Sequence, residues 1–205
     1  PRIGRASEHG MVSFSNFHTL DPVAHVVVQD LLVKSDEQAM DFTAFLFRWM
    51  AFTGWMSAVT LGNSDAEMVR AIIADPRLES EFDRLMLADL EFSEALKAFA
   101  TLWPVLNLKD VRAKIGFDVF QRFSRDEVLA GHAGVHVKRQ PVGWVAGNTP
   151  SWEQTMKVIY EVRCNLFHGE KSPLNYRDAE LVHHSNNVLK AYIVKSGCFG
   201  WYDAP

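Results

Sequence analysis

Helix-start signals recur along the chain and constrain it to a series of helices. Asp21 followed by Pro22 is typical of an N-cap and a first helical position. A serine with Glu or Gln three residues later, the capping-box pattern, occurs at Ser35, Ser64, Ser124 and Ser151. Apolar residues between these signals recur at three- and four-residue steps, which is the spacing of a helix with one buried face. The pattern predicts an all-α fold built as an antiparallel helical bundle.

The 205 residues are predicted to form one domain, because a chain of this length can bury one core. Helices are expected over 22–34, from Ser35 to about Leu61, and over 65–75, followed by one or two helices over 77–103. A final helix pair is expected over about 151–195. Residues 107–150 predict an irregular segment with a short helix within 107–116. Its part 135–150 is rich in Pro and Gly and predicts a short extended piece or a mobile loop. We treat residues 77–150 as an inserted or accessory region.

Residues 42–61 are long enough to span a bilayer, but Arg48 lies inside them and acidic residues flank them. A buried core helix is therefore the favoured interpretation. No secretory signal opens the chain, and its two cysteines, Cys164 and Cys198, are too few for a disulfide framework. These features predict a cytoplasmic protein with reduced thiols, no membrane partner and no cofactor.

The net charge of −4 is distributed unevenly along the chain. Residues 1–106 carry 8 basic and 15 acidic side chains, whereas residues 107–150 carry 7 basic and 4 acidic ones. Residues 151–205 are balanced, with 6 of each. The basic potential therefore lies in the C-terminal half, which is compatible with a focused RNA site and argues against broad binding to duplex DNA.

Arg163 and His168 in "RCNLFHGEKS" are the strongest candidate chemical groups. Five residues place them roughly 140° apart around a helix and about 7.5 Å apart along it, so they do not share one face. Two copies of the helix across a two-fold axis would bring both pairs around one cleft. An imidazole that transfers protons near neutral pH and a guanidinium that grips a phosphate suit RNA cleavage, because RNA supplies its own 2′-OH nucleophile. In the structural alternative, Arg163 pairs with an acid such as Glu161 or Glu153 and His168 only ends the helix.

Several neighbouring residues carry weaker signals. Lys171 and Arg177 are interpreted as contacts to flanking phosphates or as solvated charges, and Tyr160 as a base-stacking or core residue. His132 and His136 have the spacing of metal ligands, but no cysteine or carboxylate set accompanies them. No metal is therefore expected.

The stretch "YEVRCNLFHGEKSPLNYRDAELVHHSNNVL" resembles the signature helix pair of the HEPN superfamily, whose ribonuclease members share an R-x4-6-H motif. The upstream segment "FLFRWMAFTGWM" resembles the aromatic helix of the same families. The resemblance is sharp over 160–189 and absent over 77–150. It implies an all-α bundle and a homodimer with a composite site. It also implies metal-independent endoribonuclease activity that leaves a 2′,3′-cyclic phosphate, as in prokaryotic toxins and antiviral defence effectors, with a possible antitoxin partner.

Carried over by this resemblance, Arg163 stabilises the scissile phosphate, His168 transfers protons, and Asn165 orients His168 or touches RNA. The homodimer forms through the helix Ser151–His168. Cys164 departs from the motif, which more often has Asn, Asp or His after the arginine. A non-catalytic HEPN-like module that dimerises or binds a nucleotide or protein partner therefore remains an alternative. A third is a helical scaffold in which Arg163 and His168 are structural.

Overall fold

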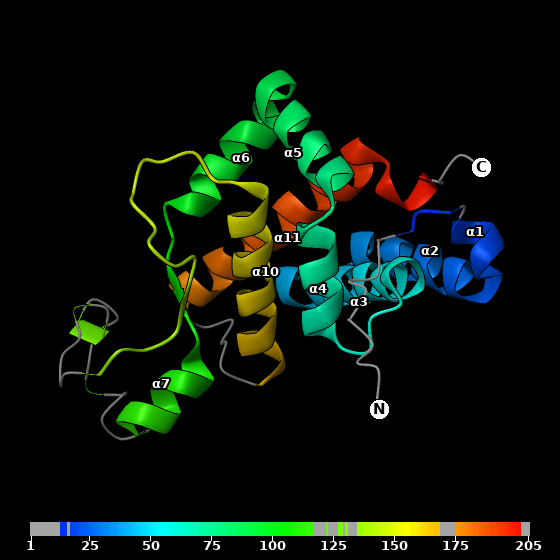
Figure 1. Cartoon of the computed structure of the whole chain (residues 1–205). Coiled ribbons are helices and arrows are strands. Elements are labelled where there is room, and N and C mark those ends of the chain that lie inside the picture. Colours follow the sequence, from blue (N-terminus) through cyan, green and yellow to red (C-terminus); the bar gives the residue numbers. More distant parts are fainter. Residues whose placement is uncertain are drawn as a thin grey trace, which may run out of the picture.

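The computed structural model describes residues 13–15, 17–116, 122, 127–128, 130, 135–168 and 175–201. Helices dominate these residues and the all-α prediction is confirmed (Figure 1). The elements in chain order are α1 Phe17–Leu20, α2 Pro22–Asp36, α3 Asp41–Thr60, α4 Asp65–Ile73, α5 Pro76–Ala88, α6 Leu90–Ala100, β1 Val105–Leu106, α7 Leu108–Ile115, β2 Arg139–Gln140, α10 Trp152–Phe167, α11 Tyr176–Ser196 and the 3₁₀ helix η2 Cys198–Gly200.

Helix α3 forms the centre of the core. Its side chains Phe45, Trp49 and Met56 are buried, and buried Phe52 and Trp55 stack with Phe199 of η2 at ring-centroid distances of 5.2–6.3 Å. Burial of each such side chain contributes about 1.5–3 kcal/mol. Within the described residues no helix combines the length and hydropathy that a bilayer crossing requires.

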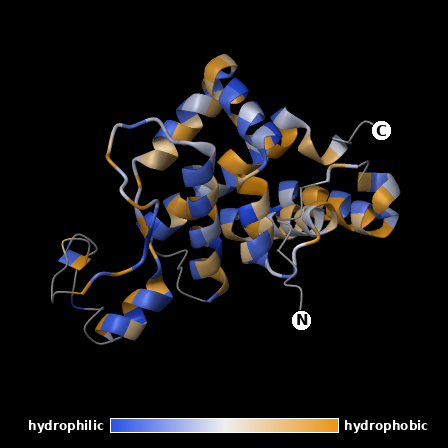
Figure 2. Cartoon of the chain, in the orientation of Figure 1, coloured by the Kyte–Doolittle hydropathy of each residue, from blue (hydrophilic) through white to orange (hydrophobic). Residues whose placement is uncertain are grey.

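Helix α2 packs along α3 at close range because Gly54 has no side chain. A Cβ at this position would lie 2.9 Å from Cγ2 of Val28. The opposite side of α2 leaves Val23, Val26 and Val27 51–75% exposed, and the orange residues of α2 are visible in Figure 2. One apolar face of this helix therefore stays in contact with solvent.

The predicted helix start at Ser35 is wrong. Ser35 lies in the last turn of α2, and α3 begins after Met40, which makes no side-chain cap. The buried Ser35 hydroxyl instead donates to the Ala44 carbonyl at 2.7 Å. A serine hydroxyl bonds whichever carbonyl is nearest, and here packing of α2 against α3 supplies one that the local sequence does not reveal.

Arg48, the charge inside the apolar helix, is buried at a polar seam. Its guanidinium donates to Asp36 and to the Asn186 side chain, each at 2.8 Å, and Lys190 lies 2.9 Å from Asp36. Arg48 thus meets an acid at a seam between α2, α3 and α11 with its own side chain buried. Burial raises the pKa of the Asp36 carboxyl, but bonds from Arg48 and Lys190 outweigh this and hold that pKa below its usual value.

We expect Asp36→Asn to lower stability at neutral pH and to have less effect in acid. A carboxyl whose folded-state pKa is lowered stabilises the fold above its unfolded pKa of about 4, and that contribution is lost as pH falls through the folded pKa. Because Asp36 is half exposed, the loss at pH 7 should be about 1 kcal/mol or less. Urea midpoints measured from pH 7 to pH 3 test this, with the exposed Asp30→Asn on the same helix as control. A gap to wild type that widens in acid would contradict it.

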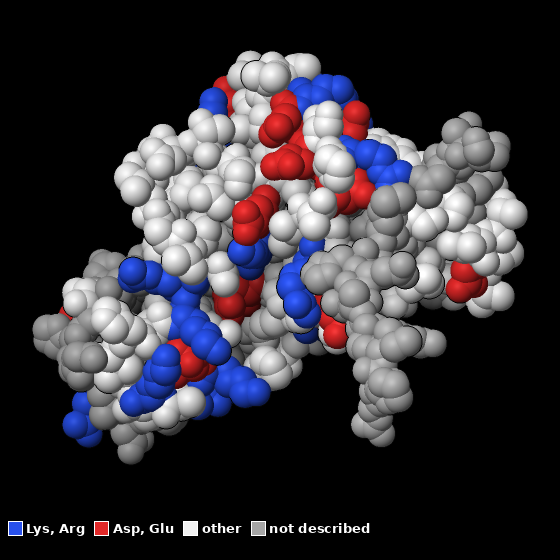
Figure 3. Space-filling view, viewed as in Figure 1, with Lys and Arg blue, Asp and Glu red and all other residues white. Residues whose placement is uncertain are grey.

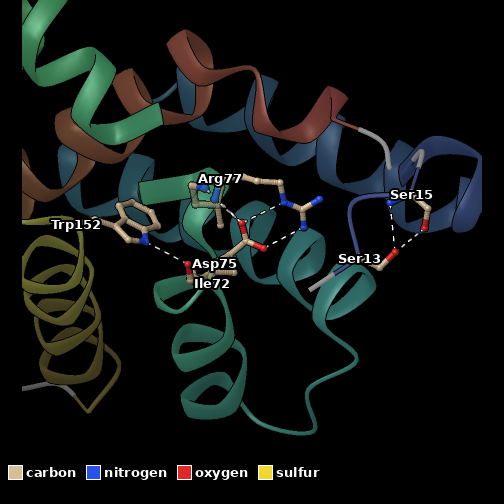
Figure 4. Close-up of polar contacts among 7 residues, drawn as sticks. Ser13, Ser15, Ile72, Asp75, Arg77 and Trp152 are labelled. Atoms are coloured by element: carbon tan, nitrogen blue, oxygen red, sulfur yellow. Dashed lines mark hydrogen bonds and ion pairs between the residues drawn. The ribbon is translucent and has the colours of Figure 1, made fainter. Parts of the chain in front are cut away.

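Helices α4, α5 and α10 meet around Asp75 (Figure 4). Asp75 is the N-cap of α5, and its buried carboxylate accepts from the Arg77 backbone at 2.9 Å and pairs with the Arg77 guanidinium at 3.0 Å. Trp152, at the start of α10, donates from its indole to the Ile72 carbonyl at 3.1 Å. These bonds satisfy groups at the end of α4 and fix α10 against it.

The predicted final helix pair is present as α10 and α11. Ser151 and Gln154 form the full capping box of α10, and Asn175 caps α11. The rings of Trp152 and Tyr192 stack 4.6 Å apart, so the first turn of α10 packs against the last turns of α11. This contact places the two helices in opposite directions, as the short connection between them predicts. Figure 1 shows α11 running obliquely behind α10.

The accessory region contributes α5 and α6 to the bundle and a smaller unit beside it. β1 pairs antiparallel with β2, Val105 opposite Gln140, and the predicted short helix α7 lies between them in sequence. Leu106, Val111 and Val128 form an apolar cluster that is separate from the main core. The predicted capping box at Ser124 lies outside the described residues.

Candidate active site at the end of helix α10

Helix α10 is buried over most of its length and becomes accessible at its C-terminal end. Its buried side chains include Trp152, Met156, Ile159 and Val162, all within the main core. The last residues differ: Phe167 is 46% exposed, and His168 is exposed as the C-cap. The two predicted catalytic residues therefore lie on the part of the helix that a ligand can reach.

Arg163 is held between a carboxylate and two aromatic rings. Its guanidinium forms an ion pair with Asp65, the first residue of α4, and Cζ lies 4.3 Å from the Phe167 ring centroid and 5.8 Å from that of Trp49. The side chain is 20% exposed. A cation over an aromatic face is stabilised by the ring quadrupole, so this arrangement fixes the guanidinium at one edge of the helix.

An open groove of about 450 Å³ lies beside Arg163, between α2, α3 and α10. Its walls are mostly apolar and include Val23, Val27 and Met50 together with Phe167. Three lining residues also carry buried polar atoms without a hydrogen-bond partner among the described residues, namely Trp49 Nε1, Thr53 Oγ1 and Arg163 Nε. Buried donors are normally paired, and here three unpaired polar atoms belong to residues of one groove wall.

His168 is not one of the residues that line this groove. Its backbone N–H donates to the Cys164 carbonyl at 3.1 Å and closes the last turn of α10, while its side chain is exposed. One chain therefore places Arg163 in the groove and His168 outside it, in line with the angular separation that their spacing predicts. The two side chains of one chain therefore do not meet in this groove.

Asn165 makes contacts to the accessory region. Its amide nitrogen donates to the Leu106 carbonyl at 2.8 Å, and its amide oxygen accepts from the Leu108 backbone at 3.0 Å. The residue is 2% exposed. Both polar ends of the side chain thus bond to β1 and the start of α7, and these contacts join α10 to the accessory region instead of reaching His168 or RNA as the resemblance implied.

Tyr160 and Cys164 lie one turn apart on α10 and interact with one another. The Tyr160 ring stacks on buried Trp49 with centroids 6.0 Å apart. This contact favours the interpretation of Tyr160 as a core residue. Burial raises the pKa of the Tyr160 hydroxyl to about 12. Burial also raises the pKa of the Cys164 thiol, so this cysteine is protonated at neutral pH and is a weak nucleophile.

Of the two residues after α10 that were predicted to contact phosphates, the structure describes only one. Arg177, on the first turn of α11, donates to the Leu102 carbonyl just after α6 and is half-buried. Its guanidinium therefore ties two helices together. Lys171 lies outside the described residues, as does His132 of the metal-spaced pair. Among the described residues no group of three or more His, Cys, Asp or Glu side chains is placed to hold a metal ion.

Sequence reasoning missed Asp65, Trp49 and Thr53 as neighbours of Arg163. Asp65 appears in the sequence only as the residue after a helix N-cap, and nothing near it indicates an arginine partner from α10. Phe167 was the one groove residue with a local signal, since it stands inside the "NLFHG" stretch. Comparison with known proteins gives no further guidance, because no protein family, curated protein or solved structure matches this chain.

Proposed function

We propose that this chain is a metal-independent endoribonuclease of HEPN type that acts as a homodimer. The observation that carries the proposal is that Arg163 and His168 occupy the accessible end of an otherwise buried helix. Arg163 faces an open groove there, and His168 is exposed to solvent. The HEPN resemblance of the same residues supplies the reaction class, and cellular RNA as the target of a toxin or defence effector is part of the proposal.

In the proposed reaction the 2′-oxygen of the RNA attacks the adjacent phosphorus. The P–O5′ bond breaks, a 2′,3′-cyclic phosphate forms, and the departing 5′-oxygen takes up a proton. Arg163 holds the phosphate and stabilises the charge that builds up on it. The His168 imidazole from the second copy takes the proton from the 2′-OH or delivers one to the leaving oxygen.

We expect the purified full chain to cleave a labelled structured RNA in the presence of EDTA. Because the nucleophile belongs to the RNA and the proton carrier is a histidine, a chelator should leave the rate unchanged. Products should carry cyclic phosphate, which resists phosphatase until acid opens the ring. Cleavage that EDTA abolishes, or products with a free 3′-hydroxyl, would contradict the proposal.

A non-catalytic binding module is the second candidate, and the groove beside Arg163 favours it. Three donor-bearing side chains in an apolar groove, each with one unpaired polar atom, suit a ligand with an apolar body and acceptor groups. The ion pair with Asp65 already neutralises the Arg163 charge in the absence of a ligand. A binding module should retain its ligand after His168→Ala, and no RNA should be cut by the wild-type chain.

A further inference from the structure

The unit formed by β1, α7 and β2, which we call the α7 lobe, carries a concentrated basic surface. Its described residues 105–116 and 135–140 contain five basic side chains and one acidic one. The basic residues are Lys109, Arg112, Lys114, Lys138 and Arg139, and all five are exposed. Figure 3 shows the blue atoms gathered over this lobe. The chain as a whole has a net charge of −4, so the lobe is opposite in sign to the rest of the molecule.

The one acid among residues 105–116 and 135–140 forms its bonds within the lobe. Asp110 accepts from the Lys138 backbone at 2.8 Å and pairs with Lys114 at 3.0 Å. Lys114 also donates to the His136 carbonyl at 2.7 Å. These bonds join α7 to the segment before β2, and the outer charges of Lys109 and Lys138 are not used in them. The surface therefore stays positively charged, and these bonds hold α7 against the segment before β2.

The lobe is attached to the same end of α10 as the proposed catalytic residues. Asn165 bonds the backbone on both sides of Asn107, and it lies one turn before His168. In Figure 1 α7 lies beside the C-terminal end of α10. The basic surface therefore belongs to a unit that is joined to α10 one turn before His168.

We propose that the α7 lobe is a docking surface for the phosphate backbone of the RNA substrate. This inference rests on the proposed function and adds to it the surface that positions the strand outside the catalytic groove. Lys109 and Arg112 are three residues apart, so they lie side by side on one face of α7. Lys138 and Arg139 extend the same charge along the neighbouring strand.

Backbone phosphates suit this surface better than a protein partner. Protein interfaces obtain most of their affinity from buried aromatic and apolar anchors, and charged residues are depleted at their centres. The exposed side chains of α7 are two lysines, one arginine and one alanine, and the apolar residues of α7 pack into the lobe's own cluster. Lysine and arginine distributed over a helix and a strand are the usual means of holding phosphates without reading bases.

The test uses the full chain carrying His168→Ala, so that RNA stays intact, and a labelled single-stranded RNA followed by fluorescence anisotropy. A triple variant, Lys109→Gln with Arg112→Gln and Lys138→Gln, removes three charges from the lobe and leaves Lys114 in place. The matched control is Lys34→Gln with Arg70→Gln and Lys97→Gln. It removes three exposed charges from α2, α4 and α6.

We expect the lobe variant to bind RNA at least tenfold more weakly at about 0.1 M salt and the control less than threefold. The slope of log K against log salt should fall by about 2 in the lobe variant, since each phosphate contact on single strands contributes about 0.7. Equal weakening in both variants, or no binding by the parent chain, would overturn the proposal. Unchanged thermal melting would show that the lobe variant is folded.

The same lobe substitutions, made in the chain that keeps His168, separate this proposal from the ribonuclease proposal. Lobe-dependent binding by a chain that never cuts RNA would refute the enzyme and leave the docking surface standing. Cleavage by the lobe variant with unchanged KM and kcat would refute the docking surface and leave the enzyme standing. If both proposals are right, we expect the lobe variant that keeps His168 to have a KM at least tenfold higher than the wild type and a nearly unchanged kcat.

Discussion

Replacing His168 by alanine is expected to slow RNA cleavage by about 10²- to 10⁴-fold, which is the usual contribution of a positioned proton carrier. The side chain is exposed at the C-cap and is absent from the groove walls. Its removal should therefore cost little stability, and RNA binding should persist. Single-turnover cleavage with saturating protein measures the chemical step directly, and thermal melting reports the fold.

His18→Ala provides the matched control for this variant. His18 is also exposed and lies on the short helix α1, away from the end of α10. Its cleavage rate should equal that of the wild type. An active His168→Ala protein would remove the catalytic assignment of this residue, and the groove would then be better explained as a ligand site.

Local signals predicted those parts of the fold that depend on neighbouring residues. The caps at Asp21, Ser64, Ser151 and Asn175 are formed because each side chain bonds a backbone N–H within its own first turn. The start of α3 was misplaced because the Ser35 hydroxyl bonds the Ala44 carbonyl across two packed helices. A contact of that kind depends on how α2 lies on α3, which periodicity does not specify.

In the candidate site, too, the sequence predicted the local features and not the contacts between distant residues. The sequence predicted that Arg163 and His168 lie near the end of a helix, and their angular separation follows from helix geometry alone. It did not predict that Asp65 pairs with the arginine or that Asn165 binds the backbone of the accessory region. Both partners are distant in sequence, and only the packing of α10 against α4 and β1 brings them together.

The ion pair with Asp65 makes Arg163 the residue at which the catalytic and structural interpretations diverge. In the structural interpretation the guanidinium serves only to join α10 to α4. In the catalytic interpretation Asp65 positions a guanidinium whose remaining donors face the groove, since Nε has no protein partner among the described residues. The two interpretations predict different rankings of the same set of variants.

We expect Arg163→Ala to slow cleavage by about 10²- to 10³-fold, as does removal of one preorganised donor from a developing anion. Asp65→Ala breaks the same ion pair and keeps the guanidinium, so its rate should fall much less, by about tenfold or under. Each change should cost about 1–2 kcal/mol in unfolding free energy, between the values for exposed and buried pairs. Equal losses of activity in the two variants would mean that only the ion pair matters.

Mixing Arg163→Ala chains with His168→Ala chains tests the composite site itself. If one site takes Arg163 from one copy and His168 from the other, random pairing makes half of the dimers mixed, and each mixed dimer has one intact site of two. About a quarter of the wild-type rate should then return from two inactive proteins, after the dimers are allowed to exchange. If both residues act within a single chain, no mixed dimer contains an intact pair and the mixture stays inactive. Recovery therefore requires both that the chain dimerises and that the proton carrier and the phosphate ligand belong to different copies.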